Sequence, residues 1–324
     1  MNESMNPRVS VLIPTYNQAF MLKDAIESVL SQTYCNLEIV VADDASTDNT
    51  HDVVASFDDP RIKYFINESN LGRVGNYHRA LYEYATGEWV VNLDGDDYFI
   101  YPEFIKECVA ALISNPGAIL AFADQYQLNI GQEIDTSIVR ARSGRIRVYD
   151  GTSFLFSMPR NPLRLQHLST LYNRPVALSL DFYRADIISS DYESLFRMII
   201  DKKIIHVDRI VGVWRKHGNN FSSQKDATQW VDNLDLYPSV ASFARMTMAR
   251  GKVFRIQAWL IRNFVHYARR IIVRAIVSRD PILILSVLSG ICKKDRNLYI
   301  LTILSPITLY SIVKKVLRSC FVYN

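Results

Sequence analysis

Acidic residues gather directly after an apolar run near residue 90. Trp89 to Leu93 predicts a short buried strand, and the sequence Asp94-Gly95-Asp96-Asp97 follows it. Asp94 and Asp96 lie two residues apart, and Gly95 between them leaves room for the close approach of a ligand. Carboxylate oxygens bind hard cations such as Mg²⁺ or Mn²⁺, and such cations hold phosphate oxygens. The simpler alternative is a polar turn before the helix that begins at Pro102.

Polar residues also follow two other predicted strands. The β-branched run Val9 to Ile13 should stop at Pro14, which opens the sequence Pro14-Thr15-Tyr16-Asn17. Leu37 to Ala42 predicts a second strand, which ends in Asp43-Asp44. An aromatic ring and a hydroxyl can hold a base and a ribose, and an aspartate can accept hydrogen bonds from either. The alternatives are simple packing for Tyr16 and an ordinary turn for Asp43.

Strands and helices alternate through the first hundred residues. An amphipathic helix after Asn17 has Leu22, Ile26 and Val29 on one face. The next predicted elements are a helix capped by Ser46, a strand over 62–66 and a helix over 74–85. This alternation predicts a doubly wound, mostly parallel α/β sheet. Because the carboxyl ends of neighbouring strands meet at one edge, the three polar sites should converge on one crevice.

The pattern continues less regularly beyond residue 98. Helices are predicted over 102–114 and 191–200, and strands over 118–123, 169–172 and 204–214. The stretch 127–150 is polar with some strand character, and 157–164 is a proline-rich loop. No internal repeat is present.

Charge divides the chain into two parts. Residues 250–324 hold 14 lysines and arginines but only two aspartates, although the net charge of the whole chain is only +4. An acidic body therefore precedes a basic, apolar tail. The four cysteines show neither zinc-ligand nor disulfide spacing, which favours a reducing, cytoplasmic environment. Met1 to Arg8 lacks the apolar core of a signal peptide.

The tail predicts one arginine-rich helix and two apolar runs that are too short to span a membrane. Phe254 to Val277 should form an arginine-rich helix, and two apolar runs of 12 and 16 residues follow, Pro281 to Cys292 and Leu298 to Val313. Both are shorter than the roughly 20 residues that a span needs. Flanking pairs such as Lys293-Lys294 and Lys314-Lys315 suit anionic lipid headgroups, so we predict an in-plane membrane anchor. The alternative is a helical subdomain or homo-oligomer interface, and no motif for nucleic acid accompanies the basic residues.

Five signatures, in order, carry a resemblance to a known family. They are VSVLIPTYN from Val9, SVLSQTY from Ser28, EIVVADDASTD from Glu38, NLG from Asn70 and LDGDD from Leu93. Together they resemble the family 2 glycosyltransferases, which have the GT-A fold, strongly over residues 8–125 and more weakly over 165–222. The resemblance implies inverting transfer of a sugar from a nucleotide diphosphate-sugar, helped by Mn²⁺ or Mg²⁺.

The resemblance also implies a division of the chain and of the site. Residues 1–225 would form the GT-A catalytic domain, with 8–125 as the nucleotide-sugar-binding half and 126–225 as the acceptor half. Residues 226–324 would be a helical membrane-associating extension. The nucleotide, UDP or alternatively GDP or dTDP, would be bound by Pro14, Thr15, Tyr16, Asn17, Asp43, Asp44, Arg73 and Asp94. Asp96 would be the principal metal ligand, with Asp94 beside it. The alternative interpretation of Arg73 is a solvated arginine on the surface.

Two residues of the second half complete the expected chemistry. Inverting transfer needs a base for the acceptor hydroxyl, which the family carries as the aspartate of a Glu-Asp pair at the start of a helix. Asp191 matches this aspartate, although Ser190 replaces the glutamate; Asp186 is the rival, and a capping box between Ser190 and Glu193 is the structural alternative. His217 lies in a sequence that resembles the family's Tyr-Arg-x-His-x-x-Asn-x-Ser, where it would ligate the metal or contact the leaving diphosphate.

The sequence therefore predicts an enzyme that transfers one sugar at a time. The processive members' Gln-x-x-Arg-Trp sequence is absent. The basic tail predicts a position on the inner face of the cell membrane, and the expected acceptor is a lipid-linked glycan or another oligosaccharide for surface polysaccharide. The rivals are a nucleotidyltransferase, which would need a basic triphosphate loop that Pro14 to Asn17 lacks, and a noncatalytic membrane scaffold of the same fold.

Overall fold

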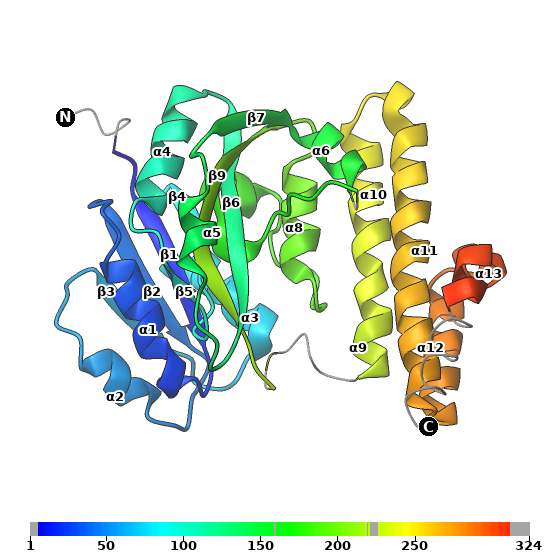
Figure 1. Cartoon of the computed structure of the whole chain (residues 1–324), viewed down its shortest axis with the longest axis horizontal. Helices are drawn as coiled ribbons and strands as arrows, with labels where there is room; N and C mark the ends of the chain where they lie inside the picture. The colour runs from blue at the N-terminus through cyan, green and yellow to red at the C-terminus, as the bar shows by residue number, and fades with distance from the viewer. Residues whose placement is uncertain (1–5, 159, 219, 221–225, 312–324) are drawn as a thin grey trace. The chain divides into compact units, whose positions relative to one another are not determined.

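The chain divides into two compact units in a computed structural model that describes residues 6–158, 160–218, 220 and 226–311 (Figure 1). One unit comprises Met1–Asp186 and Ser190–Asn220, and the other comprises Ile187–Ser189 and Phe221–Asn324. The first holds a nine-stranded sheet with helices around it, and the second consists of helices.

The first half of the sheet is parallel, as the alternating pattern predicted. Its strands are β1 (Val9–Thr15), β2 (Leu37–Asp43), β3 (Ile62–Ile66) and β4 (Trp89–Asn92), connected by the helices α1 (Ala19–Leu30), α2 (Thr50–Ala55) and α3 (Gly72–Arg79). The spatial order is β3-β2-β1-β4, so β1 has β2 on one side and β4 on the other. The loops after β2 and β4 therefore flank the loop after β1.

The second half of the sheet is mixed. Its strands are β5 (Tyr98–Phe99), β6 (Ala118–Asn129), β7 (Ile146–Asp150), β8 (Thr170–Asn173) and β9 (Lys203–Lys216). The order continues β4-β8-β6-β9-β5, with β7 also paired to β9. β8 is antiparallel to both of its neighbours, whereas β6 and β9 are parallel to each other. The helices of this half are α4 (Phe104–Ser114), α5 (Thr136–Arg140), α6 (Gly151–Ser157), α7 (Arg174–Ser179) and α8 (Ser190–Met198).

Two local predictions were wrong. Strand β1 does not stop at Pro14 but continues to Thr15, with Pro14 aligned to Ala42 of β2. The missing N–H of Pro14 removes no bond of the β1–β4 ladder, because that ladder has already ended at Leu12 and Asn92. Ser46 does not cap α2, which begins at Thr50; its hydroxyl instead accepts a hydrogen bond from the backbone N–H of Asn17.

The core of the first unit follows from its sequence pattern. Every residue of β1 and β2 is buried, because helices cover both faces of a doubly wound sheet and leave no strand face in water. Leu22, Ile26 and Val29 of α1 are buried in the same core, as their helical spacing predicted.

Glu38 of β2 is a charged residue inside this core. Its carboxylate accepts hydrogen bonds from Ser10 Oγ at 2.5 Å, from the Lys63 ammonium at 2.6 Å and from the Thr86 backbone N–H at 2.6 Å, and it pairs with Arg8 at 3.1 Å. Burial alone would raise the pKa of Glu38, but the hydrogen bonds from Lys63, Ser10 and Thr86 outweigh it and lower that pKa to about 2.

We expect Glu38→Gln to lower the free energy of unfolding by about 3 kcal/mol at pH 7. This figure is the free energy that corresponds to the lowered pKa of Glu38. Because the folded-state pKa lies below the unfolded value, the stabilisation is complete above about pH 4.5 and disappears as the pH falls towards 2. Urea unfolding of both proteins at pH 7 and pH 3 measures this difference. A stability difference that is equal at the two pH values would contradict the assignment.

The second unit is built from the helices α9 (Ala227–Asp232), α10 (Leu236–Thr247), α11 (Val253–Ser278), α12 (Pro281–Lys294) and α13 (Arg296–Leu304). Asp280 caps α12 through the N–H groups of Ile282 and Leu283, and Asp295 caps α13 through that of Leu298. Among the described residues, none of the helices combines the length and the apolarity that crossing a membrane requires. The last residues of the predicted apolar run, together with Lys314-Lys315, lie outside the described residues.

Candidate active site

The acidic loop after β4 rests directly on the loop after β1. The N–H of Leu93 donates to Leu12 O at 2.8 Å, and that of Gly95 donates to Pro14 O at 3.1 Å. A Cβ atom at Gly95 would lie 3.0 Å from Thr15 Oγ1 and 2.8 Å from Gln18 Oε1. A larger side chain at this position would crowd the buried Thr15, so Gly95 allows the acidic loop to approach the loop after β1 closely.

The loops after β1 and β2 are also joined. The N–H of Asn17 donates to Ser46 Oγ at 2.9 Å, and the N–H of Thr47 donates to Asn17 Oδ1 at 2.8 Å. Asn17 has a left-handed backbone with φ of 52°, which asparagine adopts more readily than most residues. The side chain of Tyr16 remains 47% exposed beside this junction.

Asp43 and Asp44 are buried and already have hydrogen-bond donors. Asp43 accepts from the N–H of Ser46 at 2.9 Å and from the Tyr64 hydroxyl at 2.6 Å. Asp44 accepts from Asn67 Nδ2 at 2.9 Å and from the N–H of Leu71 at 2.8 Å. Both aspartates thus fix the loops that follow β2 and β3, and their carboxylates keep further lone pairs for a ligand.

Three carboxylates come together after β4. Asp94, Asp96 and Asp97 each offer an oxygen, and these atoms lie within 4.8 Å of one another. Burial, followed by the neighbouring Asp96 charge, raises the pKa of Asp94, while the Tyr77 hydroxyl and Arg73 act in the opposite direction. Burial, with the charges of Asp96 and Asp94, also raises the pKa of Asp97. Such a cluster of oxygen ligands fits a hard divalent cation, which would relieve the repulsion between them.

The end of β9 supplies positive and polar groups to the same loop. β5, which begins directly after the acidic residues, pairs with β9 so that Tyr98 lies opposite Val213. The N–H of Arg215 donates to Asp97 Oδ1 at 2.8 Å, and the guanidinium of Arg215 also bonds the backbone carbonyl of Asp96. This pairing closes a gap of more than a hundred residues in the sequence.

His217 lies against the predicted metal ligand. Its Nε2 is 2.8 Å from Asp96 Oδ2, and Asn220 Nδ2 is 3.3 Å from the same oxygen. His217 and Asp96 were both singled out in the sequence, and the structure brings them into contact. Three residues of this stretch, Asn219, Phe221 and Ser222, lie outside the described residues.

Arg73 interacts electrostatically with both the acidic loop and Asp191. The Tyr77 hydroxyl donates to Asp94 Oδ1 at 2.7 Å, and the Arg73 guanidinium lies 5.3 Å from the centroid of the Tyr77 ring. Burial alone would lower the pKa of Arg73, but the interactions with Tyr77, Asp191 and Asp94 outweigh it and raise that pKa. Burial raises the pKa of Asp191, and Arg73 partly offsets this rise. A carboxylate with a raised pKa is a better proton acceptor near neutral pH.

Asp191 lies in the first turn of α8, but the capping box proposed as its alternative is not formed. The hydroxyl of Ser190 is buried without a hydrogen-bond partner among the described residues. Glu193 pairs instead with Arg197 through two bonds, Nε to Oε1 at 2.8 Å and Nη2 to Oε2 at 3.0 Å. This buried pair fixes the helix that carries Asp191, whereas the rival base Asp186 is exposed.

Sequence reasoning missed several residues of this site. Asp97 belongs to the same acidic sequence as Asp94 and Asp96, but that sequence did not indicate its contact with β9. Asn220 belonged to the recognised motif but received no role. Tyr77 and Arg215 gave no signal beyond helical spacing and one basic residue among several, so only the folded chain identifies their contacts.

Comparison with known proteins identifies the family. The sequence profile described as "Glycosyl transferase family 2" matches residues 10–169, which include β1 to β4 and the acidic loop. The chain belongs to this family. The GalNAc(5)-diNAcBac-PP-undecaprenol beta-1,3-glucosyltransferase of Campylobacter jejuni is 45% identical to this family 2 chain over 94 residues, 28% of the chain and 30% of that protein. The match thus spans about a third of that relative's length.

Solved structures of other proteins share the fold. The crystal structure of S. aureus TarS 1–349 in complex with UDP-GlcNAc has a TM-score of 0.58 and 17% sequence identity, with 90% of each chain covered. The mannosyltransferase PcManGT from Pyrobaculum calidifontis, in complex with GDP-Man and Mn²⁺, has a TM-score of 0.55 and 16% identity over 96% of this chain and 87% of that one. The predicted GT-A fold, with a helical C-terminal region, is confirmed.

Proposed function

We propose that the protein is an inverting glycosyltransferase that moves one sugar from a nucleotide diphosphate-sugar to an acceptor hydroxyl. The observation that carries this proposal is the cluster of Asp94, Asp96 and Asp97 in the loop after β4, together with the electrostatic interaction of Arg73 with both Asp94 and Asp191. A diphosphate site and a base candidate thus share one crevice. Residues 1–225 would be the catalytic part, with 8–125 binding the donor and 126–225 the acceptor.

The donor would lie along the edge formed by the β1 and β2 loops. Thr15, Tyr16 and Asn17 offer a hydroxyl, a half-exposed ring and a fixed backbone to a nucleoside, and Asp43 or Asp44 can accept a hydrogen bond from it. UDP is the first choice of nucleotide, with GDP and dTDP as alternatives. The two solved structures above contain UDP-GlcNAc and GDP-Man, so both bases occur with this fold.

A divalent cation, Mn²⁺ or Mg²⁺, would be held by Asp94 and Asp96, with Asp97 and His217 beside them. When bound, it would supply positive charge against the diphosphate oxygens of the donor. Arg73 and His217 would add hydrogen-bond donors to the leaving diphosphate, because a charge develops there as the sugar departs. Asp191 would take the proton of the attacking acceptor hydroxyl.

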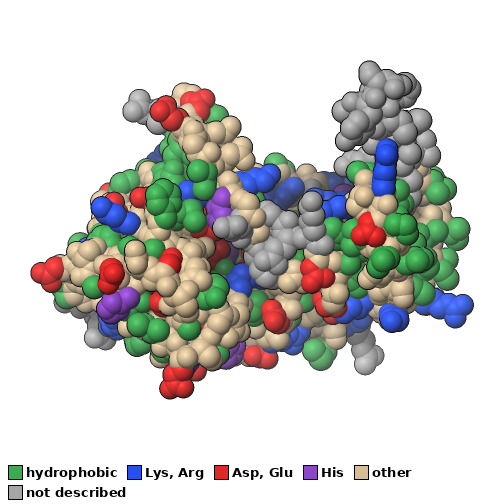
Figure 2. Space-filling model, turned by 90° about the horizontal axis from the view of Figure 1, so that it is seen from below, with side chains coloured by type: hydrophobic (Ala, Val, Ile, Leu, Met, Phe, Trp, Pro, Cys, Tyr) green, Lys and Arg blue, Asp and Glu red, His purple; other side chains and the backbone are tan. Residues whose placement is uncertain are grey.

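The acceptor would be a glycan on a membrane lipid or another surface-polysaccharide precursor. The Campylobacter relative is named for a glycan that is linked to PP-undecaprenol. The second unit exposes apolar side chains on α12, α13 and the residues after them, including Ile282, Leu285, Leu304, Ile307 and Leu309. Figure 2 shows such side chains gathered over the C-terminal helices, with lysines and arginines among them. This surface suits a position in the inner leaflet interface of the cell membrane.

The test is thermal unfolding of the full chain with UDP, GDP, dTDP, their sugar conjugates and the corresponding nucleoside triphosphates, each with and without Mn²⁺. We expect one nucleotide to raise the melting temperature in a metal-dependent way, because it binds only the folded protein. Transfer of the matching sugar to a lipid-linked acceptor, and flotation with anionic vesicles, check the remaining parts. Stabilisation by a nucleoside triphosphate alone would favour a nucleotidyltransferase, and no stabilisation by any nucleotide would favour a scaffold.

A further inference from the structure

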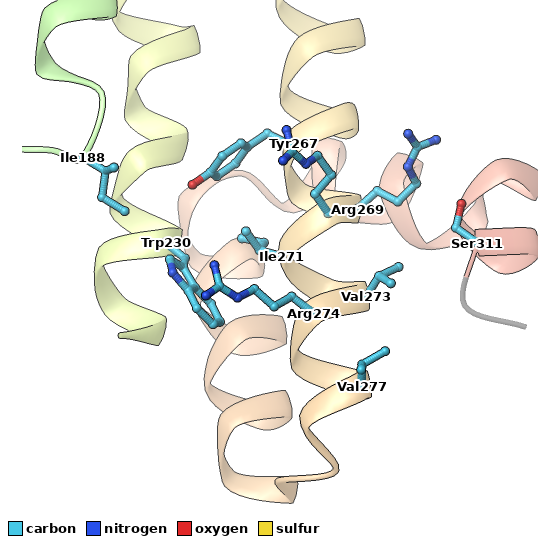
Figure 3. A pocket seen from close by; sticks show the side chains of 10 residues that line it. Ile188, Trp230, Tyr267, Arg269, Ile271, Val273, Arg274, Val277 and Ser311 are labelled. Atoms are coloured by element: carbon cyan, nitrogen blue, oxygen red, sulfur yellow. The ribbon is translucent and has the colours of Figure 1, made fainter. Parts of the chain in front are cut away.

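The second unit contains a cavity of about 650 Å³ beside α11 (Figure 3). Three arginines of α11, Arg269, Arg270 and Arg274, line it, together with Tyr267 and Ser311. The remaining lining is apolar: Ile188, Trp230, Ile271, Val273 and Val277. The cavity therefore combines cationic donors with a hydrocarbon surface, and it shares no residue with the acidic crevice.

Among the residues that the structure describes, no acidic side chain pairs with the arginines of this cavity. None of them forms a salt bridge within the described part of the chain. Arg274 lies over the ring of Trp230, 4.1 Å from its centroid, and Arg269 Nη2 contacts His266 Nδ1 at 3.1 Å. Figure 3 shows the Arg274 side chain extended towards Trp230. These contacts hold the guanidinium groups but leave their charge uncompensated.

The acidic residues of the second unit are engaged elsewhere. Asp232 and Asp235 both bind Lys294, at 2.8 and 2.6 Å. Asp226, Asp280 and Asp295 cap α9, α12 and α13 through backbone N–H groups. The unit contains no other acidic side chain. Within the described part of this unit, no acidic side chain therefore supplies counter-charge at the cavity, and a bound anionic ligand would provide it.

The arginines of the cavity also act on the neighbouring His266. Burial lowers the pKa of His266, and the nearby Arg269 and Arg270 lower it further. A neutral imidazole then accepts the hydrogen bond from Arg269, and it adds no competing charge to the cavity.

We propose that this cavity binds a phosphate or diphosphate ester carried on an apolar chain. Guanidinium groups match phosphate oxygens in charge and in hydrogen-bond geometry, which is why arginine is preferred for this group. Trp230 and Ile271, with the two valines, would contact the first part of the hydrocarbon. The chemistry is shared by a phospholipid headgroup and by a polyprenyl diphosphate. The site goes beyond the proposed transfer reaction, and its occupancy can be measured without any transfer.

The test measures binding of farnesyl diphosphate, of inorganic pyrophosphate and of phosphatidylglycerol vesicles to the full chain in EDTA, which prevents metal-dependent diphosphate binding at the acidic crevice. The variant Arg270→Ala/Arg274→Ala should bind the amphiphilic probe, farnesyl diphosphate or the vesicles, with an affinity at least about tenfold lower, because two charge-assisted contacts are lost. The matched control is Lys293→Ala/Arg296→Ala, which removes the same charge from exposed positions of the same unit outside the cavity. We expect the control to bind as the unaltered protein does.

The outcomes separate the two sources of the ligand. Arginine-dependent binding of farnesyl diphosphate but not of the vesicles identifies a polyprenyl diphosphate site, and the reverse identifies a phospholipid site. Equal weakening in the pocket and control variants would overturn the proposal, and so would equal affinity for inorganic pyrophosphate and farnesyl diphosphate. If the double variant does not fold, Arg270→Glu serves as a second test, because it changes the charge of the cavity and keeps the contact of Arg274 with Trp230. Its unchanged affinity for the amphiphile would likewise overturn the proposal.

Discussion

Asp191→Asn should lower sugar transfer by about 10²- to 10⁴-fold while leaving nucleotide binding intact. The amide has the shape of the carboxylate but cannot accept the proton of the acceptor hydroxyl. The helix should remain in place, because the buried Glu193–Arg197 pair that fixes α8 is untouched. Initial rates at saturating donor and acceptor measure the loss, and thermal stabilisation by the nucleotide measures binding.

Asp186→Asn is the matched control for this prediction. It removes the same charge five residues earlier in the chain, from an exposed side chain. We expect transfer to be unchanged in this variant. Loss of transfer in Asp186→Asn, with normal turnover in Asp191→Asn, would give the base role to Asp186 instead.

Asp96→Ala should abolish the metal-dependent stabilisation by the nucleoside diphosphate. Asp96 belongs to the three-carboxylate cluster and also contacts His217, so its loss removes a central oxygen ligand. A ligand at a hundred times its dissociation constant stabilises a protein by about 2.7 kcal/mol, and this increment should disappear. Transfer should fall by about 10³-fold, since a bound metal supplies several kcal/mol of charge stabilisation.

The unliganded protein offers an internal check on this variant. Asp96 contributes to the raised pKa values of Asp94 and Asp97, so its removal relieves repulsion and should not lower the melting temperature without ligand. Asp24→Ala is the matched control, because Asp24 is exposed and bonds Arg215 Nη1 at 2.6 Å outside the cluster. Metal-dependent stabilisation should persist in Asp24→Ala. Its persistence in Asp96→Ala would exclude Asp96 as a necessary ligand.

The first half of the fold could be predicted from local sequence. Apolar runs such as those of β1 and β2, separated by amphipathic helices, identify buried parallel strands because both sheet faces are covered. The boundaries of β3 agree with the prediction for 62–66, and those of α1 follow its apolar spacing. Local rules failed at Pro14 and Ser46, where tertiary hydrogen bonding to a neighbouring loop decided the outcome.

The residue types of the candidate site were also evident from the sequence alone. Asp94, Asp96, Asp191 and His217 stood out because carboxylates and imidazole after strands or at a helix start are unusual in a core. Their sequence order and spacing indicated the family, and a family match over residues 10–169 agrees.

Only the tertiary structure decided which of these residues meet. The contact of His217 with Asp96, and that of Arg215 with Asp97, depend on the pairing of β5 with β9 across more than a hundred residues. The link from Asp94 through Tyr77 to Arg73 depends on how α3 packs beside β1. Likewise, the arginines of α11 read as a basic helix in sequence, and only folding shows that the unit's aspartates are engaged elsewhere. Sequence spacing determines contacts within a helix or strand, whereas contacts between distant segments follow from sheet order and packing.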